Sequence, residues 1–158
     1  MIKLISMRII VQRVLKANLT IDSKLISSIS KGEVLLVSFT NDDNKDIVDK
    51  MIDKLLKLRI FEDENGKTNL NIDSCNGEIL AVSQFTLYAN LAKGNRPSFE
   101  YCMKSDVARD LYNYFAAKLK EKYEKTCFGV FQADMKVELV NDGPFTVILD
   151  SKELNYHE

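Results

Sequence analysis

Histidine, tryptophan, proline and cysteine are scarce in this 158-residue chain, which has one, none, two and three of them. The histidine, His157, stands next to last, where chains are usually mobile, so a Ser-His-Asp or Cys-His catalytic arrangement is not expected. Cys75, Cys102 and Cys127 are widely spaced and include no C-x-x-C pair. They argue against a disulfide framework and a zinc site, and we expect reduced cysteines and no metal or other cofactor.

Long hydrophobic runs and an excess of charge of one sign are also absent. No run approaches the ~18 apolar residues of a membrane span, and 22 basic residues balance 23 acidic ones for a net charge of −1. This balance provides no overall electrostatic footprint for nucleic acid, so any RNA contact must be local. Residues 1–6 lack the apolar core and cleavage site of a secretory signal. The sequence therefore predicts a cytoplasmic protein without a membrane partner.

What is present is the composition of an ordinary single domain, with 46% hydrophobic and 28% charged residues. β-Branched residues and the turn signal Asp22-Ser23 predict antiparallel strands early in the chain. Apolar residues at intervals of about four positions predict two helices, the first capped by Asp43 or Asn44 and the second by Ser105 with Asp106. The expected strands are 8–14, 18–21, 25–29, 34–39, 79–82, 135–140 and 145–149, and the expected helices are 47–56 and 107–123.

Two segments without regular periodicity connect these elements. Residues 90–103 form a loop long enough to suspect a role. Residues 141–144, Asn-Asp-Gly-Pro, are a turn signal expected to join the last two strands. The predicted architecture is a single α/β domain, in which a mixed, largely antiparallel β-sheet is combined with two main helices.

Most of the clustered hydrogen-bonding groups lie in two short segments. Ser83-Gln84-Phe85-Thr86-Leu87-Tyr88-Ala89 follows an apolar run, and Asn141-Asp142-Gly143-Pro144-Phe145-Thr146 comes about fifty residues later. By composition alone, the first predicts an ordinary strand whose phenylalanine and leucine face the core, and the second a hairpin turn. Asp134 and Asp142 are weak candidates for a catalytic carboxylate pair, because such residues beside Gly-Pro more often bond the turn backbone.

These two segments resemble those of the D-aminoacyl-tRNA deacylases. The likeness spans about residues 7–150, with residues 1–6 as an N-terminal extension and 151–158 as a C-terminal tail. Ordered segments across nearly the whole chain are more specific than any single motif. The further matching segments are Met7-Arg8-Ile9-Ile10-Val11-Gln12-Arg13-Val14, Leu58-Arg59-Ile60-Phe61, Lys93-Gly94-Asn95-Arg96-Pro97-Ser98-Phe99 and Phe131-Gln132-Ala133-Asp134-Met135.

The resemblance implies a cytoplasmic homodimer that hydrolyses the ester between a D-amino acid and the 3′ end of tRNA, and that also removes glycine mischarged onto the alanine tRNA. Ser83, Gln84, Phe85 and Thr86 would form the catalytic pocket for the terminal adenosine and the aminoacyl group. In the family the 2′-hydroxyl of the tRNA is thought to assist the attack of water, which suits a chain without a general base. The older alternative makes Thr86 a nucleophile, although its hydroxyl would lack an activating base.

Gly143 and Pro144 would decide which amino acid enters the pocket. The resemblance implies that the bond between them is cis and that both carbonyl oxygens reach into the partner subunit's pocket, where an L side chain would clash with them. A glycyl ester has no side chain and would pass. Arg13 would brace this Gly-Pro loop, and Met135 and Asn141 would support the site.

Basic residues near the long loop are a further candidate for tRNA contact. Lys93, Arg96 and Lys104 lie in or next to residues 90–103. They would meet the tRNA backbone, and an ordinary solvated surface loop is an equally good interpretation.

The chain departs from the family pattern at three positions. It has Phe145 where valine usually follows Gly-Pro, Thr68 where methionine is more frequent, and Ser38 where glycine is. Only Phe145 adjoins the active motif in the sequence, so it is the residue expected to affect the range of side chains accepted.

Two rival functions stay open. A related class with the same scaffold has a trans Gly-Pro bond and hydrolyses L-threonine mischarged onto the alanine tRNA. Some relatives are described as non-catalytic nucleic-acid-binding modules, which the balanced charge disfavours.

Overall fold

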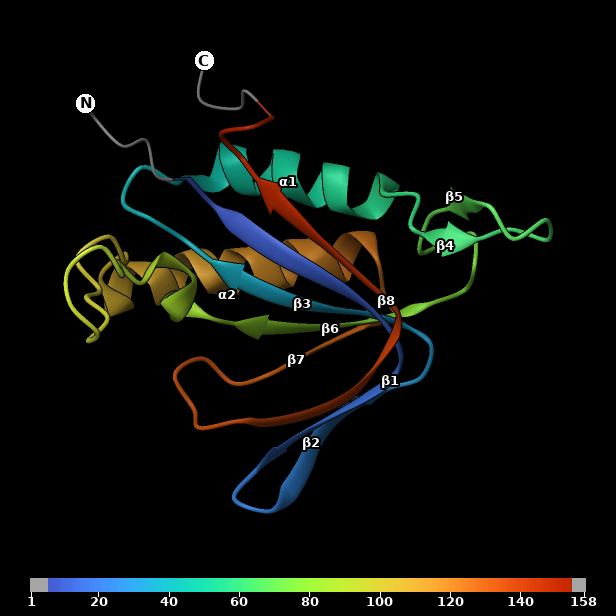
Figure 1. The fold of residues 1–158 in the computed structure, drawn as a ribbon, viewed down its shortest axis with the longest axis horizontal. Helices are drawn as coiled ribbons and strands as arrows, with labels where there is room; N and C mark the ends of the chain where they lie inside the picture. The colour runs from blue at the N-terminus through green and yellow to red at the C-terminus, as the bar shows by residue number, and fades with distance from the viewer. Residues whose placement is uncertain (1–5, 155–158) are drawn as a thin grey trace.

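A mixed β-sheet with two helices packed on one face makes up residues 6–154, the part of the chain that the computed structural model describes (Figure 1). The α/β class and the two main helices predicted from the sequence are confirmed. No helix within these residues is long and apolar enough to cross a membrane. In chain order the elements are β1 (Arg8–Ile21), β2 (Lys24–Ile29), β3 (Gly32–Ser38), α1 (Lys45–Lys57), β4 (Phe61–Glu62), β5 (Thr68–Leu70), β6 (Glu78–Ser83), the 3-10 helix η1 (Phe85–Tyr88), α2 (Ser105–Lys122), β7 (Thr126–Phe128) and β8 (Lys136–Asp150).

The strand pairing is antiparallel around β1 and parallel farther into the sheet. β1 pairs with β2, β3 and β8 in antiparallel fashion, whereas β3 pairs with β6, and β6 with β7, in parallel. The parallel register sets Val37 beside Ser83. The carboxyl ends of β3 and β6 therefore lie together at one edge of the sheet.

The β1–β2 hairpin follows the sequence prediction, but β1 itself is longer than expected. Asp22 and Ser23 have φ of 49° and 65°, the two positive values that a two-residue hairpin turn requires. Instead of separate strands at 8–14 and 18–21, the chain forms one strand with register shifts against β8 on both sides of Val14. These irregularities bend β1 without breaking it.

The end of the chain also contains one strand where two were expected. Asn-Asp-Gly-Pro does not reverse the chain, so the predicted hairpin is wrong. β8 runs along β1 from the pair Thr20–Lys136 to the pair Arg8–Asp150. β1 offers hydrogen-bonding partners before and after residues 141–144. The turn residues therefore form a bulge in the β1–β8 ladder instead of a hairpin.

Both helices begin close to their predicted positions. Asn44, and not Asp43, caps α1 by accepting a hydrogen bond from the N–H of Ile47 at 3.0 Å. The predicted cap of α2 is wrong, because Ser105 and Asp106 already belong to the helix and its N-cap, Lys104, makes no side-chain capping bond. The sequence prediction also missed the short strands β4, β5 and β7.

Two hydrophobic clusters fill the two faces of the sheet. α1 and α2 pack on a cluster that contains Ile9, Val11, Leu35, Val37 and Ile79. On the other face, the second half of β1, together with β2 and the first half of β8, closes over β3 and β6 around a smaller cluster. The sheet is thus half rolled up, as Figure 1 shows by the curved paths of β1 and β8.

The boundary residues of the predicted domain are part of this structure. Ser6 is buried, and so is Ser151, whose N–H donates to the carbonyl oxygen of Met7 at 3.0 Å. Most of the proposed N-terminal extension and half of the C-terminal tail, including His157, lie outside the described residues.

Candidate active site

A cavity of about 920 Å³ opens at the carboxyl ends of β3 and β6. The start of α2 and the segment that leads from β7 into β8 complete its walls. The carboxyl edge of parallel strands is where ligands commonly bind in α/β folds. The lining residues include Val34, Leu36, Val82, Met103, Ala108, Phe131, Met135, Val137 and Leu139.

Polar side chains are a minority in the lining of this cavity. They are those of Gln12, Ser38, Ser83, Gln84, Ser105, Gln132 and Asp134. A mostly apolar cavity with a few placed polar groups is typical of small-ligand sites. Ser83, Gln84 and Phe85 of the predicted catalytic segment are among the lining residues, and so is the predicted supporting residue Met135.

The catalytic segment is not a strand beyond Ser83. The N–H of Gln84 donates to Val37 O at 2.8 Å, and the chain then turns into η1. Phe85 is 59% exposed and Tyr88 is buried, so the prediction of a strand with its phenylalanine in the core is wrong. The first N–H groups of a short helix have no acceptor within that helix. The N–H groups of Phe85 and Thr86 therefore have no hydrogen-bond acceptor within η1.

Neither the threonine nor the cysteine at this edge contacts a base. Thr86 is exposed and does not line the cavity in the single chain, and its hydroxyl oxygen accepts a hydrogen bond from the amide of Gln84. The thiol of Cys102 donates to Phe85 O at 3.5 Å, and burial raises the pKa of this thiol. A threonine held by an amide donor and a protonated thiol are both poor nucleophiles.

Charge is nearly absent from the cavity walls. Asp134 is the one acidic side chain among the described lining residues, and it pairs with Lys136 at 3.0 Å where both side chains are mostly exposed. Asp142 pairs with Arg13 instead, so the weakly predicted carboxylate pair has two separate sets of contacts. Within residues 6–154, no three His, Cys, Asp or Glu side chains gather closely enough to hold a metal. The cavity can bind and orient a ligand, and the one carboxylate in its described lining, that of Asp134, is exposed and paired with Lys136.

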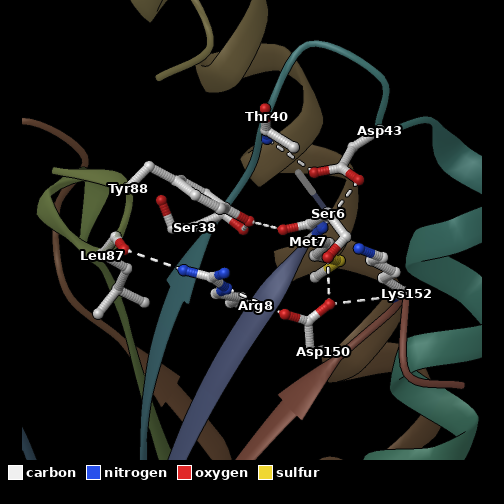
Figure 2. Close-up of polar contacts among 10 residues, drawn as sticks. All are labelled: Ser6, Met7, Arg8, Ser38, Thr40, Asp43, Leu87, Tyr88, Asp150 and Lys152. Atoms are coloured by element: carbon white, nitrogen blue, oxygen red, sulfur yellow. Dashed lines mark hydrogen bonds and ion pairs between the residues drawn. The ribbon is translucent and has the colours of Figure 1, made fainter. Parts of the chain in front are cut away.

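Tyr88 fixes the far end of η1 (Figure 2). Its buried hydroxyl donates to the carbonyl oxygens of Ser6 and Ser38. Burial raises the pKa of Tyr88, so the hydroxyl keeps its proton and remains a donor. The backbone of η1 is therefore attached to the start of β1 and the end of β3.

Charged groups reinforce this attachment (Figure 2). Arg8 donates to Leu87 O at 3.4 Å and to the carboxylate of Asp150 at 3.0 Å, and its guanidinium lies 5.3 Å from the centre of the Tyr88 ring. Asp43 accepts the N–H of Met7 at 3.0 Å, and burial raises the pKa of this carboxyl to about 7. Both ends of the described chain thus hold η1 in place.

Gly143 and Pro144 lie in a bulge of β8 and do not line the cavity of their own chain. The ladder pairs Val14 with Asn141 and Gln12 with Thr146, so Arg13 alone faces residues 142–145. The Gly143–Pro144 peptide bond is cis, and both residues are exposed. The bulge therefore presents the Gly-Pro pair on the surface, outside the cavity of its own chain.

Arg13 occupies the space beneath this bulge. Its Nε donates to Asp142 O at 3.1 Å, and its Nη1 donates to Ile60 O at 2.8 Å. Its guanidinium lies 4.8 Å from the centre of the Phe145 ring, a cation–π distance. The side chain of Arg13 thus contacts a backbone carbonyl and an aromatic ring of the bulge.

The predicted tRNA-binding cations all lie on the surface. Lys93 and Arg96 are exposed in the loop between η1 and α2, and Lys104 is exposed at the N-cap of α2, next to the cavity residues Met103 and Ser105. Asn141, predicted to support the site, is exposed at the edge of the bulge. None of these four residues lines the cavity.

Several lining residues were not predicted from the sequence. Gln12 and Ser38 come from β1 and β3, which only the sheet register brings to this edge, whereas Gln132 lies within the matched segment that begins at Phe131. Of the three departures from the family pattern, only Phe145 was expected next to the site. Ser38, another of the three, also lines the cavity. Thr68 lies in β5 and is not a lining residue.

A family model described as D-Tyr-tRNA(Tyr) deacylase matches residues 10–150. The chain belongs to this family. The family predicted from the sequence is therefore confirmed, and with it the class of enzyme, a deacylase.

Curated relatives agree with the family assignment. A D-aminoacyl-tRNA deacylase of Lactobacillus gasseri is 51% identical over 91% of this chain and 99% of its own length. One from Clostridioides difficile is 48% identical over 93% of this chain and 99% of its own length.

Solved structures add the likeness in fold. The structure of a c-Myc DNA unwinding element binding protein is 38% identical, has a TM-score of 0.85, and covers 90% of this chain and 97% of its own. That of a probable eukaryotic D-amino acid tRNA deacylase has a TM-score of 0.81 at 18% identity over 92% of this chain and 100% of its own. The second likeness shows that the deacylase fold is shared at low identity.

Proposed function

We propose that this protein is a cytoplasmic homodimer that hydrolyses the ester of D-aminoacyl-tRNA to free tRNA and a D-amino acid. The observation that carries the proposal is the cavity edged by Ser83, Gln84 and Phe85, whose described lining contains hydrogen-bonding groups and a single carboxylate, Asp134, that is paired with Lys136. Relatives about half identical over nearly the whole chain bear the name D-aminoacyl-tRNA deacylase. The terminal adenosine and the aminoacyl group are the parts of the substrate that fill the cavity.

The reaction divides between protein and substrate. Water attacks the ester carbonyl carbon, the bond to the ribose oxygen breaks, and that oxygen leaves with a proton. The 2′-hydroxyl of the terminal ribose assists the attacking water, since the only carboxylate in the described cavity walls, that of Asp134, is paired with Lys136. The N–H groups of Phe85 and Thr86 hold the carbonyl oxygen as negative charge develops, an effect worth roughly 3 to 4 kcal/mol per donor in other enzymes. Thr86 positions the ester through the Gln84–Thr86 hydrogen bond and is not a nucleophile.

Selection for D-amino acids is assigned to Gly143 and Pro144 of the partner subunit. D and L isomers differ in the direction in which the side chain leaves Cα, so backbone atoms placed in the L direction exclude one isomer. A clash of about 4 kcal/mol gives about a thousandfold discrimination. A glycyl ester passes this filter, which extends the substrates to glycine mischarged onto the alanine tRNA.

Gly143 and Pro144 are exposed and do not line the cavity of their own chain, which is the reason for proposing a shared site. Mixing two impaired variants tests it, with the hydrolysis of L-tyrosyl-tRNA that Pro144→Ala is expected to gain as the readout. In a mixture of Thr86→Ala and Pro144→Ala chains, a shared site regenerates one intact site in each mixed dimer, about a quarter of all sites after random exchange. A site built within one chain regenerates none, and activity equal to that of the separate variants would reject the shared site.

Deacylation assays decide the function itself. The wild type is expected to hydrolyse D-tyrosyl-tRNA and glycyl-tRNA and to spare L-tyrosyl-tRNA. Equal rates on the D and L esters would reject the chiral filter. Thr86→Ala is expected to keep part of the activity, and its complete loss would favour covalent catalysis. Pro144→Ala is expected to weaken the discrimination between the isomers.

Two alternatives predict different results in the same assay. The 38% identical structure is named as a DNA-binding protein, and nucleic-acid binding without catalysis predicts no hydrolysis of any ester. The related class that edits L-threonine predicts removal of L-threonine from the alanine tRNA but no cleavage of D-tyrosyl-tRNA. The curated names favour the D-specific enzyme over both.

A further inference from the structure

We propose that Phe99 is a stacking platform for the base that directly precedes the terminal adenosine of the tRNA. The proposal rests on the proposed function, because it extends the same substrate by one nucleotide beyond the cavity. Lys93, Arg96 and Lys104 then lie near the phosphates of this single-stranded 3′ end.

The geometry of two exposed aromatic rings is the starting point. Phe85 is 59% exposed and Phe99 is 44% exposed, and their rings meet edge to face with centroids 5.2 Å apart. Phe85 lines the cavity and Phe99 does not. Phe99 is therefore the next aromatic surface beyond the cavity edge, and a strand that leaves the cavity past Phe85 meets it.

The loop holds this ring in a defined place. Asn90 and Ser98 exchange two backbone hydrogen bonds of 2.7 and 3.0 Å, and the Asn90 amide also donates to Glu100 at 2.7 Å. On the other side of Phe99, its carbonyl oxygen accepts the N–H of Cys102 at 3.1 Å. The backbone on both sides of Phe99 is thus fixed before a ligand arrives, which lowers the entropy cost of binding.

The charges around the ring fit a nucleic acid. Residues 90–104 contain Lys93, Arg96 and Lys104 against the single acid Glu100, which already binds Asn90. In a chain of net charge −1, this is a local excess of positive charge. Proteins bind single-stranded RNA by stacking its bases on aromatic side chains and placing cations along its phosphate backbone. An apolar surface of a partner protein would not pair with these cations.

A cycle of two substrates and two proteins isolates the contact. The substrates are D-tyrosyl-tRNA and the same molecule with an abasic nucleotide next to the terminal adenosine. We expect removal of the base to raise the KM of the wild type about tenfold, and Phe99→Ala to raise the KM for intact tRNA by a similar factor. On the abasic substrate, wild type and Phe99→Ala are expected to be equal, and kcat is expected to change little.

Control variants separate stacking from damage to the loop. Phe99→Tyr keeps an aromatic face and is expected to behave like wild type. Leu91→Ala removes another exposed apolar side chain of the same loop, 68% exposed, and is expected to have no effect. Loss of activity by Phe99→Ala on both substrates equally, or on neither, would overturn the proposal while the deacylase function stands. Failure of the wild type on every D-aminoacyl-tRNA would instead reject the proposed function.

Discussion

The hydroxyl of Tyr88 donates a hydrogen bond to the main-chain carbonyl oxygen of Ser6, which lies 82 residues earlier in the chain. This bond ties the last residue of η1 to Ser6, two residues before β1 begins. The first residues of η1, Phe85 and Thr86, stand at the proposed oxyanion position. Their placement therefore depends on a buried anchor that does not itself touch the substrate.

Removal of this anchor is expected to affect both stability and catalysis. Tyr88→Phe leaves two buried carbonyl oxygens, those of Ser6 and Ser38, without their donor, at a cost of about 1 to 3 kcal/mol. Urea unfolding measures the loss, and a lowered kcat on D-tyrosyl-tRNA reports the shift of η1. Tyr114→Phe is the control, because that hydroxyl donates to Asp49 at 2.7 Å at a half-buried site far from η1. A Tyr88→Phe enzyme with unchanged kcat would show that η1 needs no anchor.

Arg13 is predicted to be irreplaceable by lysine. Its guanidinium donates in two directions, to Asp142 O and Ile60 O, and also lies over Phe145, a combination that an ammonium group cannot reproduce. Arg13→Lys is expected to lower stability by about 1 to 3 kcal/mol and to increase hydrolysis of L-tyrosyl-tRNA relative to D-tyrosyl-tRNA.

Arg59→Lys is the matched control for this substitution. Arg59 donates a single bond to Asn69 O at 2.8 Å in an exposed position, so its replacement is expected to change neither quantity. Discrimination that remains intact in Arg13→Lys would contradict the bracing role.

The sequence predicted the positions of the two helices well because the signals for them are local. The four-residue recurrence of apolar side chains and the Asn44 cap depend on neighbours within one turn. The hairpin expected at residues 141–144 failed because β1 supplies a long pairing edge that overrides the local turn. Gln12 and Ser38 joined the cavity through strand register, a non-local property that no single segment contains.

Gly143 is predicted to tolerate no side chain. Its φ of +124° is unfavourable for an L residue, and an added Cβ would lie 3.1 Å from both Arg13 Nη2 and Phe145 N. Gly66→Ala is the matched control, because Gly66 also has a positive φ, +74°, but has no atom within 4 Å of the added Cβ. Gly143→Ala is expected to unfold at lower urea concentration than Gly66→Ala and to lose discrimination between D- and L-tyrosyl-tRNA. Equal unfolding midpoints would show that the bulge yields to the added methyl group.

Glu33 is a buried carboxyl on β3, and its Oε1 has no hydrogen-bond partner. Burial raises the pKa of Glu33 from 4.5 to about 8. The folded protein therefore keeps this proton up to pH about 8, whereas the unfolded chain releases it near pH 4.5. Between these values the unfolded state binds fewer protons, so stability falls as pH rises.

Glu33→Gln is expected to remove this dependence on pH, because an amide is neutral in both states. The difference in unfolding free energy between variant and wild type is expected to grow in favour of the variant as pH rises from 4.5 towards 8, by about 1.4 kcal/mol per pH unit. Urea unfolding at pH 5, 6.5 and 8 measures it, with the exposed Glu138→Gln as control. Contributions from other buried acids such as Asp43 are common to both proteins and cancel in the difference. Parallel pH profiles for wild type and Glu33→Gln would mean that Glu33 is ionised in the folded protein throughout this range.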